Sequence, residues 1–328
     1  MIRWGIVGLG NMAHKFANSI KETDNSRLVA IASLNEKRLK SFKENFQISE
    51  KNIYYTYDDL INSQNIDAIY ISTLNNTHLE IIKKCAENKK NILCEKPFTL
   101  NYEEAKKAKD YIKKNNINFY EAIAYRSHNQ IRVIKEIIDQ NEIGNIISID
   151  SSFGFKVNKI KPKTRLFSKK LGGGSILDIG SYPLSFLNFL FNDKNEYEIT
   201  DVIGGYASTG VDDYAKAKVI INKNINCSIS VSIKENLPNK INIKGSKGEL
   251  IVNNPWLPDK KSFLDIKSSL SFYKKFVNSD LSIYANQIQK ISENFEKKIN
   301  NDKFAVGISD SLHIMRILSL WSNLIKNK

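Results

Sequence analysis

Cysteine is scarce in this chain of 328 residues, and long apolar runs are missing from it. Its three cysteines, Cys85, Cys94 and Cys227, have no metal-site spacing. An odd number of cysteines in a chain of this length indicates reduced thiols, and therefore a cytoplasmic protein. No apolar run approaches the roughly 20 residues of a membrane-spanning helix. The first run, Ile2–Leu9, is short and broken by glycines, which predicts a strand and not a secretory leader.

Arginine is also scarce, because the basic residues comprise 42 lysines and only 7 arginines. The formal net charge of +14 would ordinarily suggest a nucleic-acid partner. Phosphate and base recognition, however, favour the bidentate guanidinium group of arginine. The lysines are moreover spread along helical faces such as Glu103–Lys114. We therefore expect a solvated lysine surface and no nucleic-acid partner.

In the first third of the chain, short apolar runs alternate with segments of helical periodicity. The apolar runs are Ile2–Leu9, Leu28–Ser33, Ala68–Ser72, Asn91–Cys94 and Ile117–Ala124. The helical segments are Lys15–Glu22, Glu36–Glu44, His78–Asn88 and Tyr102–Asn115. This alternation predicts an α/β fold with a doubly wound parallel sheet. Ligands bind such sheets at the carboxyl ends of the strands.

The pattern changes from about Ile146, where strands predominate. The predicted strands are Ile146–Phe155, Tyr214–Asn222, Asn226–Ile233, Lys240–Gly245 and Glu249–Val252. Several alternate between apolar and polar residues, which indicates an antiparallel sheet with one solvated face. Two helical stretches follow, near Ile283–Ile299 and Ile308–Ile325. Because single cores seldom exceed roughly 250–300 residues, we predict a Rossmann domain over 1–120 and an α+β domain over 121–328.

The first turn of the chain fits the pattern G-x-G-x-x-G/A, with Gly8, Gly10 and Ala13 at the three key positions. Gly8 permits the tight turn, Gly10 lets the backbone approach a pyrophosphate, and Ala13 allows close helix–sheet packing. A helix that begins at Asn11 and Met12 offers unpaired N–H groups to phosphates. The motif follows a strand and opens a helix, so we predict dinucleotide binding here.

The end of the second predicted strand bears on the choice between NADP and NAD. Acidic residues at this position accept hydrogen bonds from the ribose of NAD, whereas this chain has the small, neutral Ser33. Lys37 and Arg38 follow and are suited to a 2′-phosphate. Glu36 remains a possible partner of the ribose, and the two cations also fit an ordinary helix surface. We predict NADP as the preferred cofactor, with NAD as the alternative.

Two further segments carry groups suited to proton transfer. Lys96 follows the fifth predicted strand, where a lysine can donate a hydrogen bond to a substrate oxygen or exchange a proton with it. Downstream, three glycines precede Asp178 and Tyr182, which lie four residues apart and so share a helix face. The carboxylate can orient the phenol or pair with Lys96. Taken alone, Asp178 also fits a helix-start carboxylate and Tyr182 a half-buried core aromatic.

Together these segments resemble the Gfo/Idh/MocA family of oxidoreductases along nearly the whole chain. Glu95-Lys96-Pro97 and Gly172–Tyr182 match its two main motifs, and Glu121–His128 is similar to the segment that opens its second domain. Phe98–Asn101, Phe153–Phe155, Arg165–Phe167 and Leu177–Leu184 resemble the branch that contains dihydrodiol and xylose dehydrogenases.

The resemblance implies specific roles for residues of this chain. Lys96 would hold and polarise the reacting oxygen, Asp178 would bind substrate and set the charge of the lysine, and Tyr182 would be a general acid/base. Many family members have histidine in place of Tyr182, so the proton donor is either Tyr182 or Lys96. Further cofactor contacts would come from Thr73, Asn75, His78 and Glu95, and substrate contacts from Tyr125, Phe153 and Arg165.

The resemblance also implies a cis peptide bond between Lys96 and Pro97 and a homodimer paired through the large sheet. Arg165 follows a basic run in a long predicted loop, where it would cover the nicotinamide, bind an acidic substrate or remain solvated. His78 is expected to fix its loop more than to catalyse. Ala124 stands where animal dihydrodiol dehydrogenases tend to have a substrate-stacking tryptophan, which favours a sugar over an aromatic diol.

The sequence therefore predicts an NAD(P)-dependent dehydrogenase or reductase that acts on a CH–OH group of a sugar or related polyol. No cluster of histidine, cysteine and carboxylate residues has zinc spacing, and no metal is expected. A trans-dihydrodiol dehydrogenase is one alternative. A dinucleotide-binding regulator that has lost catalysis is another, although Lys96 and Asp178 are both in place.

Overall fold

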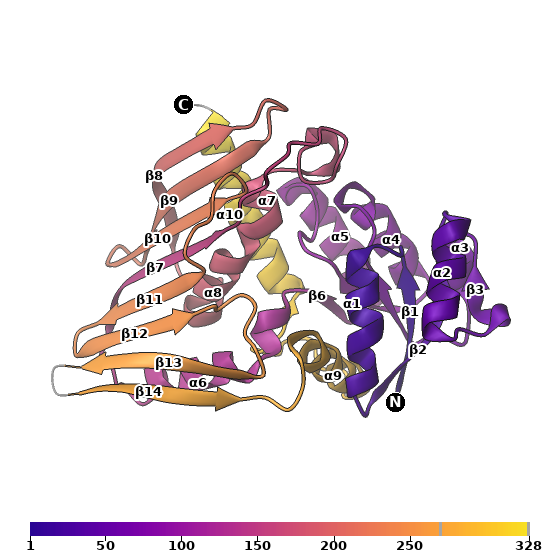
Figure 1. The fold of residues 1–328 in the computed structure, drawn as a ribbon, viewed down its shortest axis with the longest axis horizontal. Coiled ribbons are helices and arrows are strands. Elements are labelled where there is room, and N and C mark those ends of the chain that lie inside the picture. The colour runs from indigo at the N-terminus through magenta and orange to yellow at the C-terminus, as the bar shows by residue number, and fades with distance from the viewer. Residues whose placement is uncertain (269–270, 327–328) are drawn as a thin grey trace. The chain divides into compact units, whose positions relative to one another are not determined.

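The computed structural model describes residues 1–268 and 271–326, which form two compact units (Figure 1). Unit 1 comprises Met1–Ser127 and Leu281–Leu312, and unit 2 comprises His128–Asp280 and His313–Lys328. The segment Leu281–Leu312 thus packs with the N-terminal unit, whereas the sequence pattern placed it in the second domain.

Unit 1 contains a seven-stranded sheet in the order β15-β6-β5-β4-β1-β2-β3. Its strands are β1 (Ile2–Val7), β2 (Ser26–Ala32), β3 (Ile53–Tyr54), β4 (Ala68–Ile71), β5 (Asn91–Cys94), β6 (Phe119–Glu121) and β15 (Val306–Gly307). The first six are parallel, and β15 pairs antiparallel with β6 at the edge. Helices connect the parallel strands, so the predicted doubly wound Rossmann sheet is confirmed.

Helices of unit 1 cover the sheet and bury its apolar strands. They are α1 (Asn11–Ser19), α2 (Glu36–Phe46), α3 (Tyr57–Asn62), α4 (His78–Glu87), α5 (Tyr102–Asn115) and α9 (Ile283–Glu296). Trp4 on β1 is fully buried and contacts Phe16 of α1 and Phe295 of α9, with ring centroids 5.3 and 5.6 Å away. The Trp4 indole also donates a hydrogen bond to Ser292 at 3.0 Å. Burying these rings supplies much of the apolar stabilisation that holds α9 to the sheet.

Unit 2 contains an eight-stranded sheet in the order β14-β13-β12-β11-β7-β10-β9-β8. Its strands are β7 (Ile146–Gly154), β8 (Tyr197–Tyr206), β9 (Asp212–Ile221), β10 (Ile225–Ser232), β11 (Lys240–Gly245), β12 (Gly248–Asn253), β13 (Lys261–Ser268) and β14 (Phe272–Asn278). β7 and β10 pair in parallel, and the other neighbours are antiparallel. Cys227, Ile229 and Val231 of β10 are buried and alternate with more accessible polar residues, as the sequence predicted.

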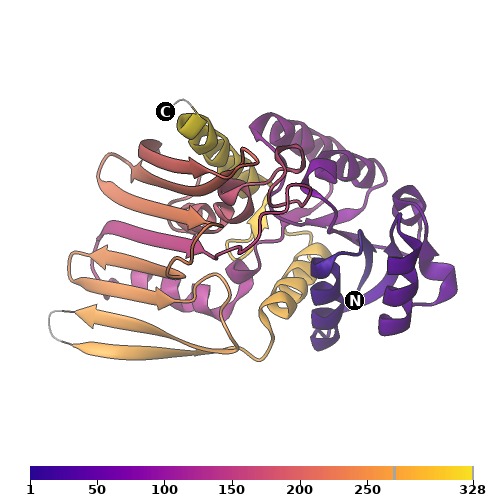
Figure 2. The same cartoon turned by 45° about the horizontal axis from the view of Figure 1, so that its top comes forward.

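Helices of unit 2 lie on one face of this sheet (Figure 2). They are α6 (Asn129–Asp139), α7 (Ser175–Ile179), α8 (Ser181–Phe191) and the later part of α10 (Ile308–Lys326). Short 3-10 helices complete the two units, at Ile20–Glu22, Glu50–Asn52, Asn75–Thr77, Ala124–Ser127 and Lys169–Leu171. Within the described residues, none of the helices has the length and apolar character needed to cross a membrane.

Candidate active site

The turn between β1 and α1 has the geometry that the glycine motif requires. Gly8 has a φ of +88°, and a Cβ atom there would lie 2.7 Å from the Thr73 side chain. Only glycine satisfies both conditions without strain. At Gly10, by contrast, a Cβ atom would meet only the Ser72 carbonyl oxygen at 3.9 Å. The backbone before α1 is therefore open to a phosphate, and it leads into the first N–H groups of a helix, which bind anions.

The loop after β4 lies directly against the glycine turn. Ser72 donates a hydrogen bond to the Gly8 carbonyl at 2.6 Å, and Thr77 donates to the Thr73 hydroxyl at 2.7 Å. Asn75 in the same loop is 5% exposed. The structure thus brings the predicted cofactor-binding residues after β1 and after β4 together at the carboxyl edge of the sheet.

Ser33 and Arg38 lie at the same edge, after β2. Ser33 is 4% exposed, and its hydroxyl accepts a hydrogen bond from the Asn35 N–H at 3.1 Å. Asn35 caps α2 through a 3.1 Å hydrogen bond from the Arg38 N–H. This cap places Arg38 in the first turn of α2 with an exposed side chain. In NAD-binding proteins of this fold, an acidic residue at this position accepts hydrogen bonds from the ribose. Here the position is occupied by a neutral serine, and an exposed guanidinium follows it.

The segment that carries Lys96 is held by side chains from neighbouring elements. Glu95 accepts a hydrogen bond from the Tyr70 hydroxyl on β4. The Pro97 carbonyl lies 3.0 Å from Nδ1 of His78 at the start of α4, and the Phe98 N–H donates to Glu121 on β6 at 2.9 Å. The peptide bond between Lys96 and Pro97 is cis, as the resemblance implied. Lys96 itself is partly exposed. Its backbone is held by the hydrogen bonds of Glu95 before it and of Pro97 and Phe98 after it.

His78 and Tyr70 act in this arrangement as neutral hydrogen-bond donors. Burial lowers the pKa of His78, so its ring is neutral near pH 7. Because a carbonyl oxygen only accepts, Nδ1 must carry the proton that faces Pro97. Burial likewise raises the pKa of Tyr70 well above its ordinary value, which keeps the phenol protonated toward Glu95. His78 thus fixes the loop that follows Lys96.

In unit 2, the three-glycine segment is packed against the start of β9. Gly174 has a φ of +118°, and a Cβ atom there would lie 2.3 Å from the Asp212 carboxylate. Asp212 accepts hydrogen bonds from the Ser175 hydroxyl and the Ile176 N–H, both at 2.7 Å. Asp212 therefore caps α7, the helix that carries Asp178. Burial raises the pKa of this carboxyl group.

Asp178 forms an ion pair with Arg165. The Arg165 guanidinium donates to the Asp178 carboxylate at 2.6 Å; the aspartate side chain is 4% exposed and the arginine side chain 50%. The loop that carries Arg165 also contacts the glycine segment, where the Gly174 N–H donates to the Leu166 carbonyl at 3.0 Å. The structure shows Arg165 bound to Asp178, a partner that was not among the alternatives expected from the sequence.

Asp178 and Tyr182 do not lie on one continuous helix. α7 ends at Ile179 and α8 begins at Ser181, with Gly180 between them. Pro183 lacks the N–H that would bond back to Ile179, so the helical ladder is interrupted here. The expectation that Asp178 and Tyr182 share one helix face is therefore wrong. The two residues are four apart in sequence, but they lie on two consecutive helices.

Tyr182 belongs to an aromatic cluster with Phe153 and Trp256. The Tyr182 ring contacts Phe153 edge-on at 5.0 Å and Trp256 at 6.1 Å between centroids. The Trp256 indole donates to the Ser152 carbonyl at 2.8 Å. Phe153 and Trp256 are buried, whereas Tyr182 is partly exposed. Such packing limits the positions that the phenol can adopt.

Tyr125, Arg126 and His128 of the segment Glu121–His128 are buried. Tyr125 is 0% exposed, and its predicted contact with substrate stays a prediction. Arg126 donates to the Lys303 carbonyl at 2.6 Å, which ties its 3-10 helix to a later part of unit 1. His128 caps α6 by accepting the Gln130 N–H at 3.1 Å, and burial lowers its pKa to about 4.

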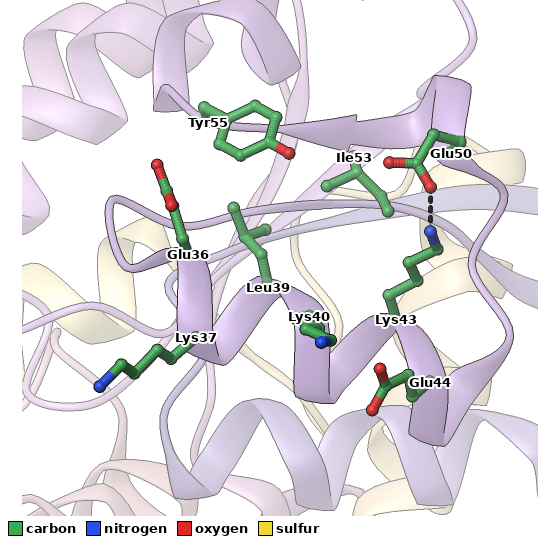
Figure 3. Close-up of a pocket in the computed structure, with 9 residues that line it drawn as sticks. All are labelled: Glu36, Lys37, Leu39, Lys40, Lys43, Glu44, Glu50, Ile53 and Tyr55. Atoms are coloured by element: carbon green, nitrogen blue, oxygen red, sulfur yellow. Dashed lines mark hydrogen bonds and ion pairs between the residues drawn. The ribbon is translucent and has the colours of Figure 1, made fainter.

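A surface cavity of about 650 Å³ lies along α2 (Figure 3). It is lined by Glu36, Lys37, Leu39, Lys40, Lys43, Glu44, Glu50, Ile53 and Tyr55, and Lys43 pairs with Glu50 across it. Glu36 and Lys37, which were weighed as partners of the cofactor ribose, line this cavity, whereas Gly8, Gly10 and Arg38 do not. In the part of the chain that the structure describes, no group of three or more histidine, cysteine, aspartate or glutamate residues is arranged to hold a metal ion.

Sequence reasoning missed four residues that hold the candidate residues of each unit: Tyr70 and Glu121 in unit 1, and Asp212 and Trp256 in unit 2. Glu121 had a usable signal, since an acidic residue inside the apolar run from Ile117 to Ala124 has to be buried. The other three had none, because their partners are distant in the sequence and only the fold brings them together.

Comparison with protein families gives two matches that together cover most of the chain. Residues 2–122 match the Gfo/Idh/MocA model described as an oxidoreductase family with an NAD-binding Rossmann fold. Residues 131–251 match the Gfo/Idh/MocA C-terminal domain.

Curated relatives include trans-1,2-dihydrobenzene-1,2-diol dehydrogenases. The Xenopus tropicalis protein is 30% identical over 78% of this chain and 77% of its own length, and the Mus musculus protein is 29% identical over 78% and 76%. These relatives confirm the branch that the sequence motifs indicated.

Solved structures share the fold at lower identity. An aldose-aldose oxidoreductase from Caulobacter crescentus, complexed with glycerol, has a TM-score of 0.89 at 19% identity and covers 99% of this chain and 98% of its own. A 3-ketoreductase from Actinomadura kijaniata, in complex with NADP and TDP-benzene, has a TM-score of 0.86 at 21% identity, with coverage of 97% and 95%. At these identities the likeness concerns the fold.

Proposed function

The chain belongs to the Gfo/Idh/MocA family of oxidoreductases, and on that premise we propose that it is an NADP-preferring dehydrogenase or reductase of a sugar or related polyol. The observation that carries the proposal is the held segment Glu95–Phe98, which presents Lys96 at the carboxyl end of β5. Ligands of doubly wound sheets bind at this edge.

The residues around the glycine turn suit a dinucleotide. Gly8 and Gly10 leave the backbone open before α1, where the helix N-terminus favours a pyrophosphate. Asn11, Met12 and the loop with Thr73 and Asn75 are proposed to add contacts. Glu95 and His78 support the same edge through Tyr70 and Pro97. When bound, the nicotinamide would supply the acceptor or donor of the hydride.

The preference for NADP rests on the end of β2. Ser33 offers no carboxylate to the ribose hydroxyls, and the exposed Arg38 is able to bind a 2′-phosphate through charge-assisted hydrogen bonds. Lys37, also exposed on α2, adds positive charge. NAD is the alternative if Glu36 binds the ribose instead.

Lys96 and Tyr182 are assigned the handling of the substrate oxygen. In the oxidation of a carbinol, the C–H hydrogen leaves with its electron pair as hydride, and the O–H proton passes to Lys96 or Tyr182. In the reverse direction, the same groups stabilise the negative charge that develops on the carbonyl oxygen and return the proton. Asp178, held by Arg165, is assigned to substrate binding.

The substrate class follows from the relatives and from the lining of unit 2. The aromatic cluster suits the apolar face of a sugar ring, and Asp178 and Arg165 suit its hydroxyl groups. A trans-dihydrodiol is the second candidate, because curated relatives are named for that activity. Ala124 favours the sugar, since it offers no large ring for an aromatic diol to stack on.

Two further proposals concern the protein as a whole. All three cysteines are free and buried, which suits a reducing compartment, and we propose a cytoplasmic enzyme. Among the described residues, the helices of unit 2 lie on one face of its large sheet (Figure 2), and we propose that two copies pair through the opposite face as a homodimer.

A screen of purified protein tests the proposed function. Reduction of NADP and of NAD is followed at fixed cofactor concentration against pentoses, hexoses, deoxysugars, inositols and trans-dihydrodiols. We expect turnover with a sugar or polyol and a higher kcat/KM with NADP. Turnover confined to dihydrodiols would select the second candidate, and dinucleotide binding without turnover of any class would favour a regulator.

A further inference from the structure

Glu121 lies at the carboxyl end of β6 and is 1% exposed. Its Oε1 atom accepts the backbone N–H of Phe98 at 2.9 Å. Phe98 is two residues after Lys96, so this carboxyl group holds one end of the segment that positions the lysine. His78 and Tyr70 hold the same segment at other points, but neither of them is charged.

A carboxyl group is a costly choice for this task. A glutamine or a backbone carbonyl would also accept the Phe98 N–H, without placing an ionisable acid in the interior. Burial, and to a smaller extent the nearby charge of Glu95, raise the pKa of Glu121 to about 7. Lys96, the Phe98 N–H and the Ser311 hydroxyl of α10 favour the ionised form. The thiol of Cys94 also lies near this carboxyl group.

We propose that Glu121 is a positioning residue for Lys96. In its ionised form, Glu121 fixes the Pro97-Phe98 backbone and places a negative charge near the lysine. This inference rests on the proposed function, in which Lys96 handles the substrate oxygen. An ionised carboxylate makes a stronger hydrogen bond to the Phe98 N–H than a neutral carboxyl does. It also attracts the lysine ammonium, whereas the neutral form does not. Protonation of Glu121 therefore loosens the segment.

The inference predicts a particular pH dependence in the direction of carbonyl reduction. In this direction a lower pH only adds protons to the donor, so the donor itself does not lower the rate at the acid end. Protonation of Glu121 does lower it. The wild-type kcat should therefore fall as the pH drops through about 7, the pKa of this carboxyl group.

The decisive variant is Glu121→Gln, which has the same shape and keeps an acceptor for Phe98 but cannot ionise. We expect its kcat to be on the order of tenfold below that of the wild type at pH 8 and to stay flat between pH 6 and 8, with cofactor affinity unchanged. Its Tm at pH 8 should rise, because a buried charge is removed. Glu103→Gln, an exposed residue of α5, is the matched control and should behave as the wild type.

Glu121→Ala removes the acceptor as well as the charge, and its kcat should fall below that of Glu121→Gln at unchanged cofactor affinity. An inflection near pH 7 that persists in Glu121→Gln, or a kcat equal to the wild type, would overturn the inference. A Tm that falls in proportion to activity would show a purely structural role and would also overturn it. Failure of the proposed function is distinguishable, because Lys96→Ala would then turn over like the wild type.

Discussion

The carboxylate of Asp178 accepts a hydrogen bond from Arg165 at 2.6 Å, although the aspartate side chain is almost fully buried and the arginine side chain is half exposed. A buried carboxylate needs a partner of opposite charge, and this one is supplied by a loop that also leaves part of the guanidinium accessible. The pair therefore joins the stability of α7 to the accessibility of a group that we propose to bind substrate.

Replacing Arg165 should affect both properties. In Arg165→Ala, the buried carboxylate loses a charged partner, and we expect a loss of about 1–2 kcal/mol in unfolding free energy, at the lower end for buried pairs because the arginine is half exposed. The KM for substrate should rise on the order of tenfold, with cofactor affinity unchanged. Urea unfolding and steady-state kinetics measure the two effects. Arg165→Lys should retain part of the stability and part of the substrate affinity. Equal KM values for Arg165→Ala and the wild type would contradict the proposed contact between this residue pair and the substrate.

Asp212 should stabilise α7, although it lies more than 30 residues away in the sequence. Asp212→Ala removes the carboxylate oxygen that accepts both hydrogen bonds at the start of this helix, and we expect a loss of about 1–2 kcal/mol in unfolding free energy. Asp212→Asn retains an acceptor and removes a buried charge, so its stability should lie closer to the wild type. Denaturant unfolding of the two variants at pH 7 checks the order. Equal losses in both would show that charge, and not capping, is the contribution of this residue.

Glu121 should make stability depend on pH. Its folded-state pKa of about 7 exceeds the ordinary value of 4.5, so the folded protein binds more protons than the unfolded chain between these two values. Its contribution to stability is therefore fully present below about pH 4.5 and is lost as the pH rises through 7. Above pH 7, Glu121→Gln should be about 3 kcal/mol more stable than the wild type, and the difference should shrink toward pH 5. Urea unfolding at several pH values measures it, and a constant difference would contradict the assignment.

Arg38 should discriminate between the two cofactors. Loss of a charge-assisted contact to a 2′-phosphate costs about 1.5–3 kcal/mol, which corresponds to a decrease of roughly tenfold or more in kcat/KM for NADP. Arg38→Ala should therefore lose activity with NADP and change little with NAD. Lys40→Ala, on the same helix but within the surface cavity, serves as the control. Parallel losses with both cofactors would argue against a role at the 2′-phosphate.

The sequence predicted the parts of the fold that have strong local patterns. The alternation of apolar runs and helical segments as far as Asn115 predicted the parallel sheet, because buried parallel strands are short and continuously apolar. The strands β3, β8, β13, β14 and β15 were missed. β3 and β15 have only two residues each, and the edge strand β14, with exposed Phe272 and Phe276, has no clear apolar face. The break between α7 and α8 was also missed, although Gly180 and Pro183 signalled it.

The candidate site could be predicted only where chemistry is local in sequence. Gly8, Lys96 and Tyr182 stand in compact motifs, so their types and spacing were informative. The residues that hold them act across the fold: Glu121 reaches Phe98 from the next strand along the sheet, and Asp212 caps α7 from β9. Such contacts depend on tertiary packing, and periodicity carries no signal for them.

The most direct test of the account is the turnover of Lys96→Ala with the best substrate from the screen, measured together with its dissociation constant for NADP. We predict that kcat falls by at least about a hundredfold, while NADP binding changes by no more than about twofold and the Tm stays near that of the wild type. Turnover close to that of the wild type, or a loss explained by weaker NADP binding, would contradict the central role of Lys96.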